Sequence, residues 1–138
     1  MLLLPRFFKY KKKQKGKIFN RIDNIIKFKS IHFNSIKLIA LSHGRITAKQ
    51  INSIHLTLNK SLKKIGIVKL NLFPQNPISK KPVEVRMGKG KGNVDHWVFN
   101  VKVGFIVCEI QSTFKNKVYS ALKMAQIRLP IRTKVLFF

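Results

Sequence analysis

Apolar residues recur at helical spacing between residues 47 and 66. They follow one another at intervals of three or four positions and would share one face of a helix: Ile51, Ile54, Leu58, Leu62 and Ile65. Just before them, Thr47 is followed three residues later by Gln50, which is the pattern of a capping box. The spacing therefore predicts a helix over 47–65 that Gly66 ends.

A second helical pattern lies near the C-terminus, over about residues 113–127. Its inward-facing positions are expected to be Phe114, Val118, Ala121, Leu122 and Ala125. Leu129-Pro130 follows this run, and proline cannot continue a helix. The pattern therefore predicts a helix that ends shortly before Pro130.

Runs rich in β-branched and aromatic residues predict the strands. The expected strands are Lys29–Phe33, Ser35–Ala40, Ile67–Phe73, Val83–Met87, His96–Val103, Phe105–Ile110 and an edge strand at Arg132–Phe138. His43-Gly44-Arg45 is expected to form a turn, and three prolines predict an extended connection over Pro74–Pro82 rather than central sheet. The predicted fold class is α+β, with two helices packed on a mixed or antiparallel sheet.

Charge narrows the classes of partner. The 138 residues include 29 Lys and Arg but only 4 Asp and Glu, which gives a formal charge of +25. Because 45% of the residues are hydrophobic, the chain can still bury a modest core. We expect a basic extended tail over residues 1–20 and a single domain over 21–138. A polyanion would relieve the self-repulsion of this charge, and nucleic acid is the obvious candidate.

Several kinds of chemistry lack the residues that they need. The four carboxylates fall in four separate segments, whereas acid–base enzymes usually place them in pairs: Asp23, Glu84, Asp95 and Glu109. No run approaches the ~18 apolar residues of a membrane-spanning helix. A cationic protein on an anionic membrane surface is an alternative that the charge leaves open.

Metal and thiol chemistry are not expected either. Cys108 is the only cysteine, and its apolar neighbours favour a small buried hydrophobe over a reactive thiol. The four histidines have no cysteine or carboxylate at the spacing of metal ligands: His32, His43, His55 and His96. We therefore expect neither a metal nor a cofactor.

Three consecutive residues, 95–97, are given a structural interpretation. Asp95 and His96 are neighbours in sequence, and neighbours on a strand face opposite ways, so their adjacency is no indication of a catalytic pair. Trp97 is expected to pack inward as a core anchor, because a lone tryptophan within a strand is usually buried.

The N-terminal residues combine lysines with aromatic rings. Residues 9–17 hold six lysines, and Phe7, Phe8 and Tyr10 lie among or beside them. Such a segment is either ordered along phosphates, with its rings available to stack, or a solvated disordered tail. Lysine outnumbers arginine by 23 to 6, and residues with A/T-rich codons are abundant. This bias suggests the genome of an organelle or an endosymbiont.

Glycine and lysine alternate over Arg86–Asn93, which reads RMGKGKGN. Backbone without Cβ atoms can approach a polyanion closely, while lysines reach phosphates on either side. Nucleotide-binding loops do not fit, because no Gly-Lys pair is followed by Ser or Thr and Asn93 stands where the dinucleotide fingerprint needs glycine. An ordinary flexible hairpin loop is the other interpretation.

The wider segment Lys81–Val98 resembles the signature of the ribosomal large-subunit protein L-sixteen family. The resemblance extends to the basic tail, to the start of the first predicted helix, to parts of the proline-rich connection and to the C-terminal end: Met1-Leu2, Lys9–Lys17, Gly44–Ile51, Phe73-Pro74, Pro77-Ile78, Lys81-Pro82 and Leu129–Thr133. Residues 17–43 depart from the pattern, since they contain no glycine where the family commonly has several.

The resemblance implies an RNA-bound structural protein of the large subunit rather than an enzyme. Its place would be at the base of the central protuberance, near the aminoacyl-tRNA site and the peptidyl-transferase centre. The implied partners are large-subunit rRNA, tRNA and neighbouring ribosomal proteins, without membrane insertion or a homo-oligomer. The expected address is the mitochondrion, with a plastid or an endosymbiont as the alternative. A general RNA-binding or membrane-surface protein outside the ribosome is the alternative function.

Two sets of candidate contacts follow. The candidate rRNA-binding residues are Arg6, Lys9, Tyr10, Lys11, Lys12, Lys13, Lys15, Lys17, Arg45, Lys49, Lys60, Lys63, Lys64, Lys80, Lys81 and Arg132. The candidate tRNA-proximal loop is Arg86, Met87, Gly88, Lys89, Gly90, Lys91, Gly92 and Asn93.

Overall fold

The computed structural model describes residues 4–5, 7–8, 11–18, 35–63, 65–88 and 90–137. The expected strand at Lys29–Phe33 lies outside these residues. So do five of the candidate RNA contacts: Arg6, Lys9, Tyr10, Lys64 and Lys89.

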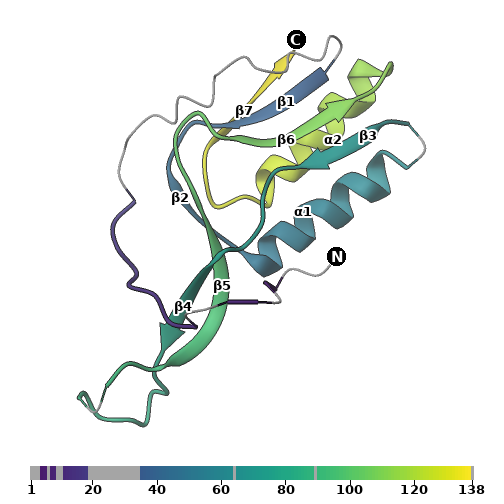
Figure 1. Cartoon of the computed structure of the whole chain (residues 1–138). Coiled ribbons are helices and arrows are strands. Elements are labelled where there is room, and N and C mark those ends of the chain that lie inside the picture. The colour runs from purple at the N-terminus through teal and green to yellow at the C-terminus, as the bar shows by residue number, and fades with distance from the viewer. Residues whose placement is uncertain are drawn as a thin grey trace.

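The strands form two antiparallel sheets, and two helices accompany them (Figure 1). One sheet has the order β3-β6-β1-β7 and consists of Ile67–Leu70, Ile106–Gln111, Ser35–Ala40 and Thr133–Phe137. The other has the order β2-β5-β4 and consists of Gly44–Thr47, Asn93–Val101 and Asn76–Lys80. The helices are α1 at Ala48–Ser61 and α2 at Lys115–Ile127. This arrangement confirms the predicted α+β class.

The core lies between the four-stranded sheet and both helices. The helices contribute their predicted apolar faces: Ile51, Ile54 and Leu58 from α1, and Val118, Ala121, Leu122 and Ala125 from α2. Alternate residues of β1 and β6 complete the cluster: Ile36, Leu38, Ala40, Cys108 and Ile110. Each large apolar side chain buried there stabilises the fold by about 1.5–3 kcal/mol, so this cluster is the main source of stability.

The capping box at the start of α1 is confirmed. The Gln50 amide donates to Thr47 Oγ1 at 3.3 Å, and the Thr47 amide donates to Gln50 Oε1 at 2.9 Å. The helix ends at Ser61, before Gly66, and Leu62 closes it by donating its amide to Leu58 O. Gly66 instead lies where the chain enters β3, and a Cβ at this position would come within 2.6 Å of the Gln111 carbonyl oxygen. Close approach to β6 is therefore the reason for this glycine.

Most strand predictions are confirmed with small shifts at the ends. The strand at Ser35–Ala40 has its predicted bounds, and the run after Pro130 forms β7 at the edge of its sheet. The run that begins at Ile67 ends at Leu70 rather than Phe73. The predicted turn at residues 43–45 is wrong in part, because β2 begins at Gly44 and pairs with the end of β5.

The interpretation of Pro74–Pro82 as a connection misses β4, which lies within it. Pro77 pairs with Trp97 of β5. A strand with proline is tolerated here because β4 lies at the edge of the three-stranded sheet. Conversely, the strand expected at Val83–Met87 does not form. The pairing of β4 with β5 ends at Lys80 and Asn93, and the residues between them project beyond both strands.

The inward position expected for Phe114 is wrong. Phe114 occupies the N-cap position of α2, and 57% of its surface is exposed. The helical periodicity that buries Val118 begins only after this residue, so the cap side chain points away from the core.

Among the described residues, no helix is both long and apolar enough to cross a bilayer.

Candidate nucleic-acid interface

The β4–β5 connection, residues 81–92, projects from the far end of the three-stranded sheet (Figure 1). Its backbone depends on glycine, because Gly88 and Gly90 have φ of 100° and 86°, where other residues are strained. Lys81 closes the connection on itself by donating from Nζ to the Gly88 carbonyl oxygen. The described candidates of the glycine-rich loop, residues 86–93, lie here, except that Asn93 is the first residue of β5. Arg86, Met87 and Lys91 are exposed.

Residues 11–18, hereafter the tail segment, lie against the three-stranded sheet and the glycine-rich loop. Lys12 donates from Nζ to the Lys91 carbonyl oxygen at 3.0 Å, and Lys91 donates from Nζ to the Lys13 carbonyl oxygen at 2.7 Å. Lys13 in turn donates to Asn76 Oδ1 on β4 at 3.2 Å. Two basic segments that are far apart in the sequence therefore form one continuous surface.

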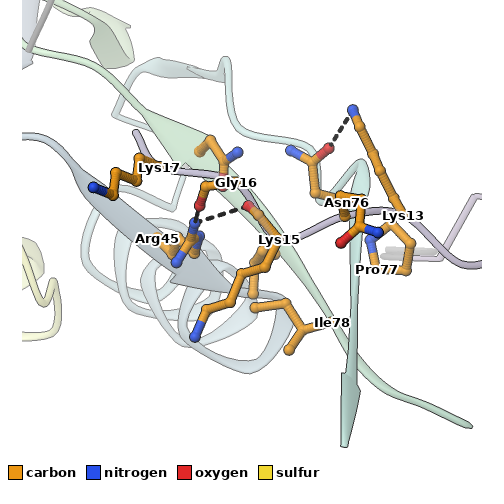
Figure 2. A pocket seen from close by; sticks show the side chains of 11 residues that line it. Lys13, Lys15, Gly16, Lys17, Arg45, Asn76, Pro77 and Ile78 are labelled. Atoms are coloured by element: carbon orange, nitrogen blue, oxygen red, sulfur yellow. Dashed lines mark hydrogen bonds between the residues drawn. The ribbon is translucent and has the colours of Figure 1, made fainter. Parts of the chain in front are cut away.

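Arg45 holds the other end of the tail segment (Figure 2). Its Nη2 atom donates to the carbonyl oxygens of Lys15 and Gly16, at 3.0 and 2.6 Å. Gly16 has φ of 58°, which favours glycine and turns the backbone there. Arg45, Asn76 and the tail segment line a pocket of about 200 Å³. Arg45 therefore uses one of its guanidinium nitrogen atoms for hydrogen bonds within the chain.

The tail segment and the loop gather like charges with few acids among them. The described part of this surface includes Lys11, Lys12, Lys13, Lys15, Lys17, Lys80, Lys81, Arg86 and Lys91. Only Glu84 and Asp95 lie close in sequence to the loop. Lysines this close repel one another, and a polyanion with regularly spaced charges relieves the repulsion.

Asp95 and His96 contact each other, contrary to the expectation of opposite faces. His96 Nδ1 lies 2.9 Å from Asp95 Oδ2. The register explains the contact: Ile78 pairs with His96 and Ser79 with Val94, so Asp95 is an extra residue in a β-bulge that breaks the alternation of side chains. The hydrogen bond to His96 lowers the pKa of Asp95, and Lys80 and Lys49 add to this effect by their charge.

Trp97 is not a core anchor. It is only partly buried, and its ring meets Phe8 edge to face, with 5.1 Å between the centroids. Trp97 lies on the three-stranded sheet rather than on the sheet that faces both helices, so the core does not cover it. Its ring instead helps to hold the N-terminal residues against the body of the protein.

The other candidate rRNA contacts are spread over the surface. Lys49, at the start of α1, and Lys60 and Lys63, at its end, are all exposed. Arg132 is exposed after α2. Lys49 lies beside the surface built by the tail segment and the loop, because it lines a pocket with Asp95 and Trp97. Lys60 and Lys63 lie at the other end of α1.

Two contributors to the interface were not anticipated. Asn76 accepts a hydrogen bond from Lys13 across 63 positions of sequence, and no local pattern marks such a partner. The sequence pattern predicts Trp97 in the core, although Pro77, its cross-strand partner, indicates the edge of a sheet.

The expectation for Cys108 is confirmed. Its side chain is fully buried in the core cluster, and burial raises the pKa of its thiol to about 12. Among the described residues, no group of three His, Cys, Asp or Glu side chains gathers into a metal site.

Comparisons of the sequence with known proteins identify the family. Residues 5–136 match the protein family described as ribosomal protein L16p/L10e. The chain is 41% identical over 135 residues to the large ribosomal subunit protein uL16 of Buchnera aphidicola subsp. Cinara cedri (strain Cc), a match that covers 96% of this chain and 94% of that protein. The basic tail segment, the glycine-rich loop and both helices all lie within the matched residues, and the chain therefore belongs to the ribosomal protein L16p/L10e family.

Proposed function

We propose that this chain is a non-enzymatic constituent of the large ribosomal subunit that binds rRNA and helps to position tRNA. The observation that supports it most directly is the reciprocal bonding of Lys12 and Lys91, which joins the tail segment to the glycine-rich loop. The two segments together supply several basic side chains, so one surface can bind several phosphates at once. Membership of a large-subunit family supplies the setting.

The proposed mechanism is electrostatic and geometric. Lysines replace the counterions around closely packed phosphates, and the α+β body holds the loop at the far end of the three-stranded sheet. In this proposal the tail, residues 1–20, and the body, residues 21–138, act together on rRNA. The loop, residues 86–93, faces tRNA near the aminoacyl and peptidyl sites and the peptidyl-transferase centre. Neighbouring ribosomal proteins are further partners, and the chain acts as a single copy.

The rRNA contacts proposed are those expected from the sequence, with one refinement. Arg45 both tethers the tail segment and faces RNA in this proposal, because the hydrogen bonds to the Lys15 and Gly16 carbonyl oxygens both come from its Nη2 atom. Lys49 extends the surface of the tail and the loop, whereas Lys60 and Lys63 contact RNA at the other end of α1.

The proposed address is the ribosome of a mitochondrion. The bacterial source of the 41% identical relative favours the alternative of an endosymbiont or a plastid. Fractionation of cells by compartment, followed by sedimentation of each lysate at high salt and mass spectrometry, tests both the address and the ribosomal role. Recovery with large subunits is expected. Recovery only in the soluble or membrane fraction would overturn the proposal in favour of a protein outside the ribosome.

The proposed role of the loop in tRNA binding is tested by the double substitution Lys89→Ala with Lys91→Ala. Subunits that contain this variant are expected to assemble and to bind tRNA about ten-fold more weakly, since two phosphate contacts are lost. Lys60→Ala with Lys63→Ala removes the same charge from α1 and is the matched control, with unchanged tRNA affinity expected. Normal tRNA binding by subunits shown to contain the loop variant would contradict the assigned role.

A further inference from the structure

A basic and aromatic surface lies on α2 and β7, at the opposite end of the molecule from the β4–β5 connection (Figure 1). It consists of Tyr119, Lys123 and Phe137 and is named the α2–β7 surface here. The rings of Tyr119 and Phe137 stack, with 5.9 Å between centroids and 26° between planes. Lys123 Nζ lies 5.3 Å from the centroid of the Tyr119 ring.

Both rings remain accessible. Tyr119 is 40% exposed and Phe137 is 53% exposed, although aromatic rings gain most by burial. The buried face of α2 is formed by other residues, Val118, Ala121, Leu122 and Ala125, so Tyr119 lies on the flank next to β7. The stacked pair therefore presents ring surface to a partner rather than completing the core.

Charge selects the class of partner. After Glu109 the sequence contains six basic residues and no acidic residue. Lys115 is also exposed, and it lies four residues before Tyr119 and eight before Lys123, so it shares their face of α2. A positive surface with accessible rings is complementary to single-stranded nucleic acid, whose bases stack on aromatic side chains while its phosphates meet lysines. Unpaired RNA bases suit it better than duplex RNA, whose bases are already stacked on one another.

We propose that the α2–β7 surface is a second RNA-contacting site, at which an unpaired base stacks on the Tyr119–Phe137 pair and Lys123 meets an adjacent phosphate. This proposal rests on the RNA-binding function proposed above but uses a different face. Its residues are separate from the tail, the loop and the α1 lysines, so it contacts a different part of the RNA. The body of the protein would then lie between two RNA segments.

The test compares two probes on the full chain by fluorescence anisotropy: a single-stranded RNA of about 12 nucleotides and a duplex of the same length. Tyr119→Leu with Phe137→Leu is expected to weaken binding of the single strand about ten-fold, because one stacked base is lost. Duplex affinity is expected to change less than about two-fold. Tyr119→Phe keeps the ring and is expected to retain wild-type affinity, which separates stacking from hydrogen bonding by the hydroxyl.

The lysine is tested by the salt dependence of binding. Lys123→Gln is expected to reduce the slope of log affinity against log salt by about one. Lys117→Gln removes the same charge from the same helix, where its Nζ lies 5.6 Å from the Phe114 ring centroid, and is the matched control. Equal effects of these two variants would remove Lys123 from the site.

Several results would overturn the proposal. Unchanged single-strand affinity in the leucine variant would do so, and so would equal losses on both probes, which a structural role of the rings would produce. In assembled large subunits, ultraviolet crosslinks from the peptide with Tyr119 are expected to reach RNA, and crosslinks to a protein would reassign the surface. If the variants of the α2–β7 surface do not change RNA binding as expected, but the wild-type chain still binds RNA in a salt-dependent way, the function proposed above stands. If wild-type protein binds neither probe, both proposals fail.

Discussion

Arg45 and Lys91 donate hydrogen bonds to backbone carbonyl oxygens of the tail segment, 29 to 78 positions away. Both residues were expected from the sequence to meet phosphates. A backbone carbonyl oxygen accepts hydrogen bonds from lysine and arginine side chains, and every residue carries such an oxygen. The identity of a basic residue therefore predicts that it bonds an acceptor, but not whether the acceptor belongs to RNA or to the protein.

Arg45→Ala is expected to release the tail segment. Its two hydrogen bonds are exposed, so together they contribute about 1 kcal/mol, which corresponds to a roughly five-fold change in tail docking. The measurement is the rate of tryptic cleavage after the lysines at 11–17, which should rise about five-fold in the variant. Arg128→Ala removes an arginine that donates to Ser53 Oγ on α1 rather than to the tail segment, and it is the control. An unchanged rate in the Arg45 variant would show that Arg45 does not hold the segment.

Cys108 offers a prediction about reactivity. Burial raises the pKa of its thiol to about 12, so almost no thiolate is present at neutral pH in the folded chain. Iodoacetamide at about pH 8 is expected to modify Cys108 at least 100-fold more slowly in the native chain than in the chain unfolded in denaturant. Mass spectrometry over time measures both rates. Comparable rates would mean that the core opens readily around β6.

At the level of elements, the β4–β5 hairpin decides where the candidate interface lies. Pro77 restricts β4 to the edge of its sheet, and the bulge at Asp95 re-aims the following side chains. The pairing stops at Lys80 and Asn93, which leaves the glycine-rich loop free of the sheet. Helix α1 was predictable with its cap because periodicity and capping are local, whereas β4 was missed because an edge strand containing proline lacks a local signal.

Gly92→Ala tests the close packing at the base of this hairpin. A Cβ there would lie 2.5 Å from the Lys80 carbonyl oxygen, so β4 and β5 would have to separate. The free energy of unfolding is expected to fall by about 1–3 kcal/mol, measured by denaturant titration. Asn93→Ala changes an exposed neighbour and should cost less than about 0.5 kcal/mol. Equal stability of the two variants would show that the loop relieves the clash freely.

At the level of the whole molecule, the charge of +25 is spread around a small core rather than placed at one end. The tail segment and the loop share one surface, and Lys49 lies beside it at the start of α1. Lys60 and Lys63 lie at the other end of α1, and the α2–β7 surface lies at the opposite end of the molecule from the loop. Such a distribution suits a protein that touches folded RNA on several sides.

The salt dependence of RNA binding measures how many phosphates these basic residues engage. If about 6–10 phosphates are engaged, the affinity of the full chain for naked rRNA should fall by roughly three to five decades between about 50 and 200 mM salt. Titrations at four or more salt concentrations give the slope. A shallow slope would contradict an interface built mainly from lysine–phosphate contacts.

The sequence determined the class of partner, both helices with their buried faces, and most strands, because charge, periodicity and capping are read from neighbouring residues. Only the tertiary structure decided that the strands divide into two sheets, that Trp97 meets Phe8, and that Asp95 contacts His96. It also joined the tail segment to the glycine-rich loop and stacked Tyr119 on Phe137. These contacts depend on strand register and on acceptors distant along the chain, which no local pattern of residues specifies.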